Sequence, residues 1–127
     1  MINYPYKKDS RGNLFPIILF QAEYKKSIAK TSALLDSGAT ISIFREDIAK
    51  QLNLVINHGT PTFLGGVGGR IKGYVHNIKL KIADKSLLVP VVFSYEYSVS
   101  FNLLGRSGIF ENFKITFDEK NLIVKVG

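Results

Sequence analysis

The stretch SALLDSGATISIF, residues 32–44, decides how the rest of this sequence is interpreted. Two apolar runs flank Asp36-Ser37-Gly38, so a carboxylate stands where the pattern indicates protein interior. An unpaired buried carboxylate is costly, and a partner or a shifted pKa normally compensates for it. Asp, Ser and Gly are also common turn residues. The stretch therefore fits either an ordinary turn or a catalytic aspartate on a tight loop between two strands.

The bulk properties of the chain fit one globular domain. It has 127 residues, of which 46% are hydrophobic, and it contains no cysteine, which excludes disulfides, thiolate zinc sites and cysteine nucleophiles. We expect a flexible N-terminal arm over residues 1–12 and a single domain over residues 13–127. The polar N-terminal segment lacks the apolar stretch of a signal peptide, and no apolar run is long enough to cross a bilayer. We therefore expect a cytoplasmic protein with no membrane partner.

The net charge of +7 raises the question of nucleic-acid binding. The basic residues occur singly or in pairs, and no cluster of the kind that follows a phosphate backbone is present. Lys79 and Lys81 alternate with Leu80 and Ile82, as is typical of the solvent-facing side of a strand. We therefore expect a solvated surface and no nucleic-acid partner.

Segments rich in β-branched and aromatic residues alternate with turn signals, which indicates an all-β domain. The expected strands cover residues 14–24, 30–35, 60–64, 70–82, 87–93, 113–117 and 122–126. Helical spacing over residues 45–52, and a weaker pattern over 105–112 that contains Gly108, predict one or two short helices. Pro90 predicts that its strand lies at an edge or carries a bulge.

The sequence lacks the residue patterns of most known kinds of catalytic site. His58 and His76 lie in unrelated contexts without metal-binding spacing, so we expect surface or turn positions for both. The segment 105–108, GRSG, lacks the spacing of a hydrolase nucleophile elbow, and the glycines of 65–69 fit neither a phosphate-binding loop nor a dinucleotide fingerprint. Carboxylate chemistry remains, with no metal and no cofactor expected.

Three separated stretches resemble the retropepsins, the retroviral-type aspartic proteases, and their cellular and prokaryotic relatives. ALLDSGA (33–39) is similar to the catalytic signature, GGVGGRIKG (65–73) to the glycine-rich flap, and FNLLGR (101–106) to the apolar-apolar-Gly-Arg element. The three stretches follow one another in the family's order. The resemblance implies a retropepsin-like closed β-barrel, the acid-protease fold, with one or two short helices, and the activity of an acid-active aspartic endopeptidase on a polypeptide substrate.

The number of Asp-Ser-Gly motifs carries a further implication. Hydrolysis by this chemistry needs one ionised carboxylate that accepts a proton from water and one neutral carboxyl that donates to the carbonyl oxygen. Asp36 is the only aspartate in the sequence that is followed by Ser-Gly or Thr-Gly. A chain with one copy can build the pair only across a two-fold axis. The sequence therefore predicts a homodimer with one shared active site.

The resemblance assigns roles to the remaining site residues. Asp36 is the catalytic residue, its loop is supported by Ser37, Gly38 and Ala39, and the Ser37 hydroxyl donates a hydrogen bond across the axis. The flap and substrate-binding positions are Leu64, Gly65, Gly66, Val67, Gly68 and Gly69. Phe101 and Leu103 line the substrate pocket, and Leu104, Gly105 and Arg106 pack behind the catalytic loop. Alternatively, the glycine run is only a flexible hairpin, and Leu103 is an ordinary core residue.

The chain also departs from the retroviral pattern. Thr40 and Ile41 follow Ala39 where the retroviral enzymes carry acidic residues, which leaves the partner of Arg106 open. The hairpin from Asp118 onward is additional, and we expect it to supply the sheet of the dimer.

Two other functions fit parts of the sequence. A catalytically weak or inactive retropepsin-like module for peptide binding or dimerisation has the same fold, because fold alone does not settle function. A basic β-barrel that binds nucleic acid would show salt-dependent binding that does not depend on Asp36.

Overall fold

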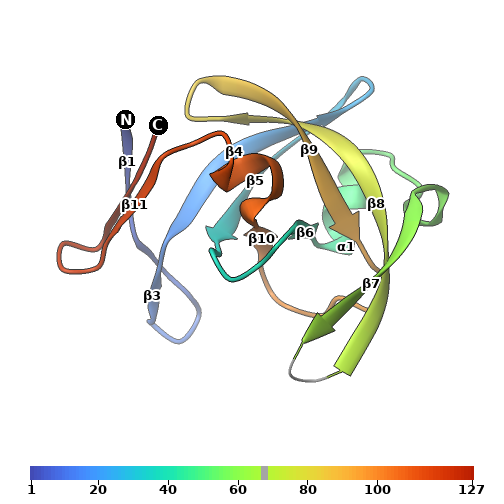
Figure 1. Cartoon of the computed structure of the whole chain (residues 1–127), viewed down its shortest axis with the longest axis horizontal. Coiled ribbons are helices and arrows are strands. Elements are labelled where there is room, and N and C mark those ends of the chain that lie inside the picture. Colours follow the sequence, from blue (N-terminus) through green and yellow to red (C-terminus); the bar gives the residue numbers. More distant parts are fainter. Residues whose placement is uncertain (67–68) are drawn as a thin grey trace.

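The computed structural model describes residues 1–66 and 69–127 and shows a predominantly β fold (Figure 1). Its larger sheet has seven strands in the order β4-β5-β10-β6-β9-β8-β7, and β4 also pairs with β8. The strands of this sheet are β4 (Ile17–Tyr24), β5 (Ser27–Leu35), β6 (Ser42–Phe44), β7 (Thr60–Gly66), β8 (Gly69–Ile82), β9 (Lys85–Phe93) and β10 (Asn102–Leu104).

Strand alternation places the core on one side of this sheet. Along β8, Ile78, Leu80 and Ile82 are buried, whereas Lys79 and Lys81 are exposed, which confirms the orientation predicted from their alternation. Burying a large apolar side chain contributes roughly 1.5–3 kcal/mol, so this pattern fixes the face that each strand turns inward. The aromatic centre of the core consists of Phe20, Phe44 and Phe93, whose rings contact one another in sequence.

Three short helical segments accompany the sheet: α1 (Glu46–Gln51), the 3₁₀ turn η1 (Ile56–His58) and η2 (Arg106–Phe110). Helix α1 confirms the helix predicted over 45–52, and acidic residues in its first turn and Lys50 in its last turn suit the helix dipole. Gly108, with a φ of 79°, breaks the regular helical geometry of η2. Among the described residues, no helix is long and apolar enough to span a membrane.

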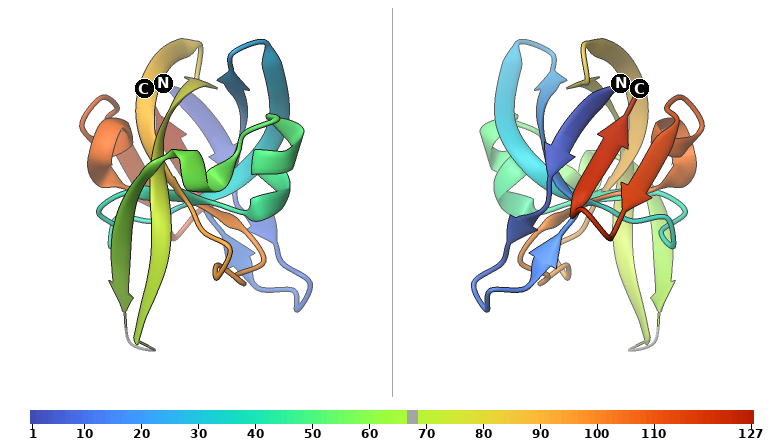
Figure 2. Two further views of the ribbon diagram at one scale, coloured as in Figure 1. Left: turned by 90° about the vertical axis from the view of Figure 1, so that its right-hand side faces the viewer. Right: turned by 90° about the vertical axis from the view of Figure 1, so that its left-hand side faces the viewer.

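A second sheet joins the two ends of the chain. Its order is β1-β12-β11, with β1 (Ile2–Pro5), β12 (Ile123–Val126) and β11 (Ile115–Asp118), and all neighbours are antiparallel. Figure 2 shows both termini side by side at one end of the molecule, opposite the end of the β7–β8 hairpin. The additional C-terminal hairpin therefore pairs with the first strand of its own chain.

The expected flexible arm over residues 1–12 is wrong for most of that segment. Residues 2–5 form β1, and β2 (Lys7–Lys8) pairs with β3 (Leu14–Phe15) around the turn 9–13. The physical reason is that β12 offers a full ladder of backbone partners to β1, and the hydroxyl of Tyr6 donates a hydrogen bond to Oε1 of Glu119 at 2.9 Å. These partners lie more than a hundred residues away in the sequence.

Candidate active site

Asp36 stands at the end of β5, where the chain turns away from the sheet. Its backbone N–H donates a hydrogen bond to the carbonyl of Leu104 at 3.0 Å, and its own carbonyl accepts one from the N–H of Ala39 at 3.2 Å. Its carboxylate Oδ1 accepts a hydrogen bond from the N–H of Gly38 at 2.9 Å. The loop therefore holds the Asp36 side chain in one orientation while leaving it half-exposed.

The position of this loop follows from three short strands. β5 runs parallel to β10, with Leu35 opposite Leu104, and β10 runs antiparallel to β6, with Leu103 opposite Ile43. The loop 36–41 joins β5 to β6, so it must pass the end of β10 that lies between them. This arrangement brings the predicted catalytic loop against the segment that starts at Leu104.

The residues after β10 form the backing of this loop. The N–H of Arg106 donates to the carbonyl of Ala39, and the N–H of Ser107 donates to that of Thr40, both at 2.9 Å. A side chain on Gly105 would bring its Cβ within 2.6 Å of the carbonyl carbon and oxygen of Ile41. Only glycine fits at this position, and the backbone of Leu104, Gly105 and Arg106 therefore lies directly against the loop.

The tip of the loop faces solvent in the single chain. Ser37 and Gly38 are exposed, and Ala39 is half-buried. A Cβ on Gly38 would lie 3.2 Å from Oδ1 of Asp36, which is tighter than an ordinary contact. The two exposed residues leave a free surface beside the carboxylate, and this surface is available to another chain.

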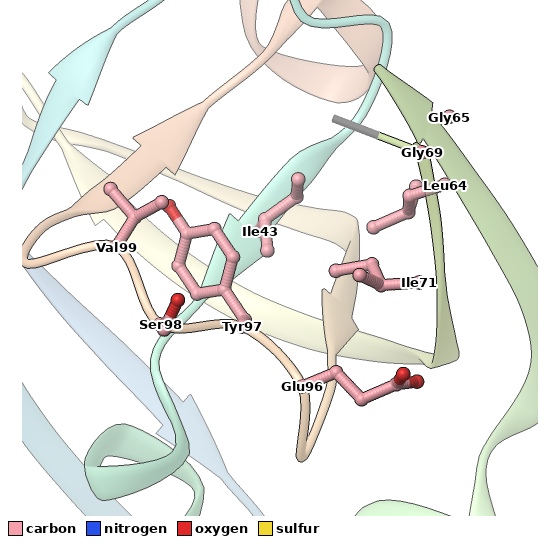
Figure 3. Close-up of a pocket in the computed structure, with 9 residues that line it drawn as sticks. All are labelled: Ile43, Leu64, Gly65, Gly69, Ile71, Glu96, Tyr97, Ser98 and Val99. Atoms are coloured by element: carbon pink, nitrogen blue, oxygen red, sulfur yellow. The ribbon is translucent and has the colours of Figure 1, made fainter. Parts of the chain in front are cut away.

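The β7–β8 hairpin covers an apolar cavity of about 320 Å³. Figure 3 shows Leu64 and Ile71 of the hairpin facing Ile43 of β6 and the ring of Tyr97 across the cavity. Leu64, Gly65 and Gly69 line the cavity, and Gly66 pairs with Gly69 in the ladder. The predicted flap residues Val67 and Gly68 lie outside the described residues.

The base of this hairpin is attached to the chain that follows β9. The hydroxyl of Ser94 donates a hydrogen bond to the carbonyl of Lys72 at 2.5 Å, and the N–H of Lys72 donates to Oε2 of Glu96 at 2.8 Å. The N–H of Glu96 in turn donates to Oγ of Ser94 at 3.0 Å. Both backbone groups of one hairpin residue are therefore held by side chains of segment 94–96.

The predicted pocket residues lie on β10 or just before it. Asn102 and Leu104 are buried, whereas Leu103 and Phe101 are half-buried and belong to the opposite face of the strand. The ring of Phe101 packs at a tilt against that of Phe15, with 6.1 Å between centroids. Neither Leu103 nor Phe101 lines the cavity beneath the hairpin.

Tyr97 is a site residue that the sequence analysis missed. It follows β9 without a motif of its own, and its hydroxyl donates a hydrogen bond to the carbonyl of Phe101 at 2.8 Å. Burial raises the pKa of Tyr97 to about 12, with the charge of Arg45 acting to lower it and that of Asp36 acting to raise it. Tyr97 therefore lies within the electrostatic reach of the candidate catalytic carboxylate.

Asn102 is a second residue that no motif indicated. It is buried, its Oδ1 accepts a hydrogen bond from the N–H of Arg45 at 2.7 Å, and its Nδ2 donates to the carbonyl of Ser32 at 3.0 Å. It thus ties β10 to both β5 and the start of α1. Its isolated place in an apolar run was the only signal available in the sequence.

Arg106 is exposed, and it forms no salt bridge with any residue that the structure describes. It lines a shallow cavity with Thr40, Ser107 and Glu111. The carboxylate of Glu111 instead accepts a hydrogen bond from the N–H of Gly108. No acidic residue that the structure describes therefore takes the place of the partner that the matching arginine has in retroviral enzymes.

The two histidines do not belong to this site. His58 is exposed, as expected, but the surface position expected for His76 is wrong. His76 is buried, and its Nε2 lies 2.8 Å from the carbonyl of Ile56, because η1 closes over β8 at this point. Within residues 1–66 and 69–127, no group of three or more histidine, aspartate or glutamate side chains is arranged to hold a metal ion.

Comparisons with known proteins agree with this geometry. A family model described as aspartyl protease matches residues 22–107, a segment that contains the Asp36 loop, the β7–β8 hairpin and β10. A search of curated proteins found no match. Among solved structures, EIAV protease complexed with the inhibitor HBY-793 is similar at 20% identity and a TM-score of 0.57, covering 72% of this chain and 82% of that one. The fold is therefore like that of a retroviral protease.

Proposed function

This chain belongs to the aspartyl protease family, and we propose that it is an endopeptidase whose two catalytic carboxylates are Asp36 of each protomer in a homodimer. The observation that carries the proposal is the Asp36 loop. The carboxylate is oriented by the N–H of Gly38, backed by Leu104, and placed beside an exposed loop tip. The Asp9 turn has the same kind of hydrogen bond, so the feature that supports a catalytic role for Asp36 is its position at the end of β5, with the segment after β10 on one side and the exposed loop tip on the other.

The mechanism needs two such carboxylates a few ångströms apart. Two like charges at that distance cannot both ionise easily, so the pair holds one proton and titrates in two linked steps. The ionised Asp36 takes a proton from a water molecule, which attacks the peptide carbonyl carbon, while the neutral Asp36 donates a proton to the carbonyl oxygen. The reaction passes through a tetrahedral intermediate and forms no covalent bond to the enzyme.

The surroundings of Asp36 supply the remaining functions. The hydroxyl of Ser37, at the exposed tip, donates a hydrogen bond to the partner's loop and locks the two aspartates in register. The β7–β8 hairpin acts as the flap that closes over the bound peptide and excludes water. The apolar cavity beneath it accepts an apolar side chain of the substrate near the cleaved bond. Polypeptides are thus the substrate class, and no cofactor takes part.

The larger sheet provides the frame of this proposal as a closed barrel. The pairing of β4 with both β5 and β8 supports closure, because β4 stands at one edge of the sheet and β8 lies next to the other edge. A barrel leaves few free backbone edges and holds the ends of β5, β6 and β10 rigidly. Rigid support matters because a misplacement of about 1 Å costs roughly a hundredfold in rate.

The proposal is tested by measuring cleavage of a denatured protein mixture and a peptide library between about pH 3 and 7, the range in which a carboxylate dyad titrates. The wild type is compared with Asp36→Asn, and size-exclusion chromatography under the same conditions reports the oligomeric state. Asp84→Asn is the matched control, because it removes an exposed aspartate in the β8–β9 turn, where asparagine tolerates the positive φ.

The expected result is cleavage with an acidic optimum in the wild type and in Asp84→Asn, and none in Asp36→Asn, with all three proteins dimeric. A folded wild-type dimer that binds peptides but never cleaves them would favour the binding module instead. A wild type that remains monomeric while cleaving would refute the shared pair of aspartates.

A further inference from the structure

A second groove lies outside the flap cavity. It has a volume of about 620 Å³ and is formed by the β2–β3 turn, the start of β4 and the segment before β10. Its apolar lining is Phe15, Ile17 and Phe101, and its polar lining comes from the turn and from Ser100. Apolar side chains beside polar and charged ones suit a ligand that has both an aliphatic part and a charge.

The turn that forms one wall is closed by several hydrogen bonds. Oδ1 of Asp9 accepts hydrogen bonds from the N–H groups of Arg11 and Asn13, both at 2.9 Å, and Gly12 adopts a φ of 82°. The N–H of Asp9 also donates to the carbonyl of Asn13 at 2.8 Å. Desolvation acts to raise the pKa of Asp9, but the hydrogen bonds from Asn13 and Arg11 and the positive charge of Arg11 outweigh it and lower that pKa below its ordinary value.

This wall carries two charged side chains, Asp9 and Arg11, and they differ in whether they can bind a ligand. The carboxylate of Asp9 is engaged in holding the turn. The guanidinium of Arg11 has no salt-bridge partner among the residues that the structure describes, and Arg11 is exposed. Arg11 can therefore offer a planar set of donors to a carboxylate in the groove.

The groove is connected to the candidate catalytic centre through Phe101. Leu104 lies opposite Leu35, the residue before Asp36, and Phe101 immediately precedes β10. Asp36 is level with the residue after Leu104, so Phe101 lies four residues, or roughly 13 Å at about 3.3 Å per residue, from the level of Asp36. An extended peptide covers this distance in about four residues. In Figure 2 the β2–β3 turn points toward the same end of the molecule as the β7–β8 hairpin.

We propose that this groove is an outer substrate subsite, in which Arg11 binds an acidic side chain located about three or four residues from the cleaved peptide bond. The inference rests on the proposed protease function and specifies its substrates: polypeptides with an apolar residue near the cleaved bond and a carboxylate farther along. Phe15 and Phe101 contact the aliphatic part of that side chain, and Arg11 pairs with its charge. Arg11 is then a specificity-determining residue that takes no part in the chemical step.

The test first locates the cleaved bond in a model peptide by mass spectrometry. Peptides that carry Glu, Gln or Lys three and four residues from that bond, on either side, are then compared by kcat/KM. The wild type is expected to prefer Glu over Lys roughly twofold to fivefold at one position, the range that an exposed charge pair provides. Arg11→Glu should reverse this order, and Arg11→Gln should abolish it.

Lys8→Glu is the matched control, because it reverses an exposed positive charge near the turn that does not line the groove. It should keep the wild-type preference, so that reversal by Arg11→Glu alone supports the subsite. Equal kcat/KM values for Glu and Lys in the wild type, or a preference that Arg11→Glu leaves unchanged, would overturn it.

A readout without cleavage separates this inference from the proposed function. The same peptides, labelled with a fluorophore, are titrated with Asp36→Asn and with the double variant Asp36→Asn/Arg11→Glu, and fluorescence anisotropy is measured. Tighter binding of the Glu peptide that reverses in the double variant supports the subsite even if the wild type cleaves nothing. Identical binding of Glu and Lys peptides would overturn the subsite while leaving the protease proposal intact.

Discussion

Replacing Gly105 with alanine places one methyl group directly against the backbone of the Asp36 loop. The new Cβ would lie 2.6 Å from both the carbonyl carbon and the carbonyl oxygen of Ile41, and 2.9 Å from the carbonyl oxygen of Ala39. An ordinary contact begins at about 3.4 Å, so the loop must move by roughly 0.8 Å. Backbone on both sides is held by strands, so no flexible side chain can absorb this shift.

The cost can be estimated from these contacts. Overpacking a well-packed site costs about 1–3 kcal/mol, and a backbone obstacle places Gly105→Ala near the upper end, at about 3 kcal/mol. For a domain of this size, 1 kcal/mol lowers the Tm by roughly 4 °C, so we expect a fall of roughly 10 °C. Because the displaced segment adjoins the catalytic carboxylate, peptidase activity should fall roughly a hundredfold as well.

The assay is thermal unfolding monitored by circular dichroism, together with kcat/KM on a cleavable peptide. Gly65→Ala is the matched control for stability, because a Cβ at Gly65 meets nothing within 4 Å. Its Tm should stay within about 2 °C of the wild type. A Gly105→Ala protein with an unchanged Tm and full activity would refute the claim that this glycine is required for the close approach to the loop.

Three further substitutions test other contacts of the site. Asn102→Ala leaves two partly buried backbone groups without their partner, so the free energy of unfolding in urea should fall by about 2 kcal/mol. Burial raises the pKa of the Tyr97 phenol to about 12, so the wild type should lose stability as the pH rises from about 10 to 12. Tyr97→Phe removes this phenol, so the free energy of unfolding of the variant should change less over the same range. Ser94→Ala removes the hydroxyl that holds the carbonyl of Lys72, so hydrogen exchange of the β7–β8 amides should become faster.

Each of these results has a matched comparison. Asn77→Ala changes an exposed asparagine and should leave the urea midpoint unchanged. Identical pH dependence of unfolding in Tyr97→Phe and the wild type would contradict the buried environment of the phenol. Ser86→Ala, at an exposed position of β9, should not alter exchange in the hairpin, and an equal effect of both serine substitutions would remove Ser94 from this role.

The strands and the Asp36 loop were predictable because their signals are local. Alternation along residues 78–82 specifies which face of β8 is buried, and the apolar runs around Asp36-Ser37-Gly38 specify a turn between two inner strands. A helix was predicted for 45–52 from acidic residues followed by Ile48 and Leu52 on one face, and α1 lies within that range. In each case the residues that decide the structure lie within a few positions of one another.

The features that were missed depend on distant partners. Asn102 bonds to residues 57 and 70 positions away, and His76 owes its burial to a turn twenty residues earlier. The pairing of β1 with β12 joins opposite ends of the chain, so the polar composition of the first residues indicated an arm instead of a strand. Local propensity carries no information about such partners, because tertiary packing selects them.

The sheet that joins β1 and β12 places the two ends of this chain side by side, so a short loop could connect them. Gly127 lies so close to Met1 that a Cβ on it would be 2.9 Å from the Cα of Met1, and its N–H and carbonyl are paired with Lys114. A few added residues would bridge this gap, and new ends could be opened at the exposed β8–β9 turn around Asp84. Such a circular permutant would keep every strand, the Asp36 loop and the outer groove in place. The order in which the strands are synthesised is therefore separable from the architecture that they build.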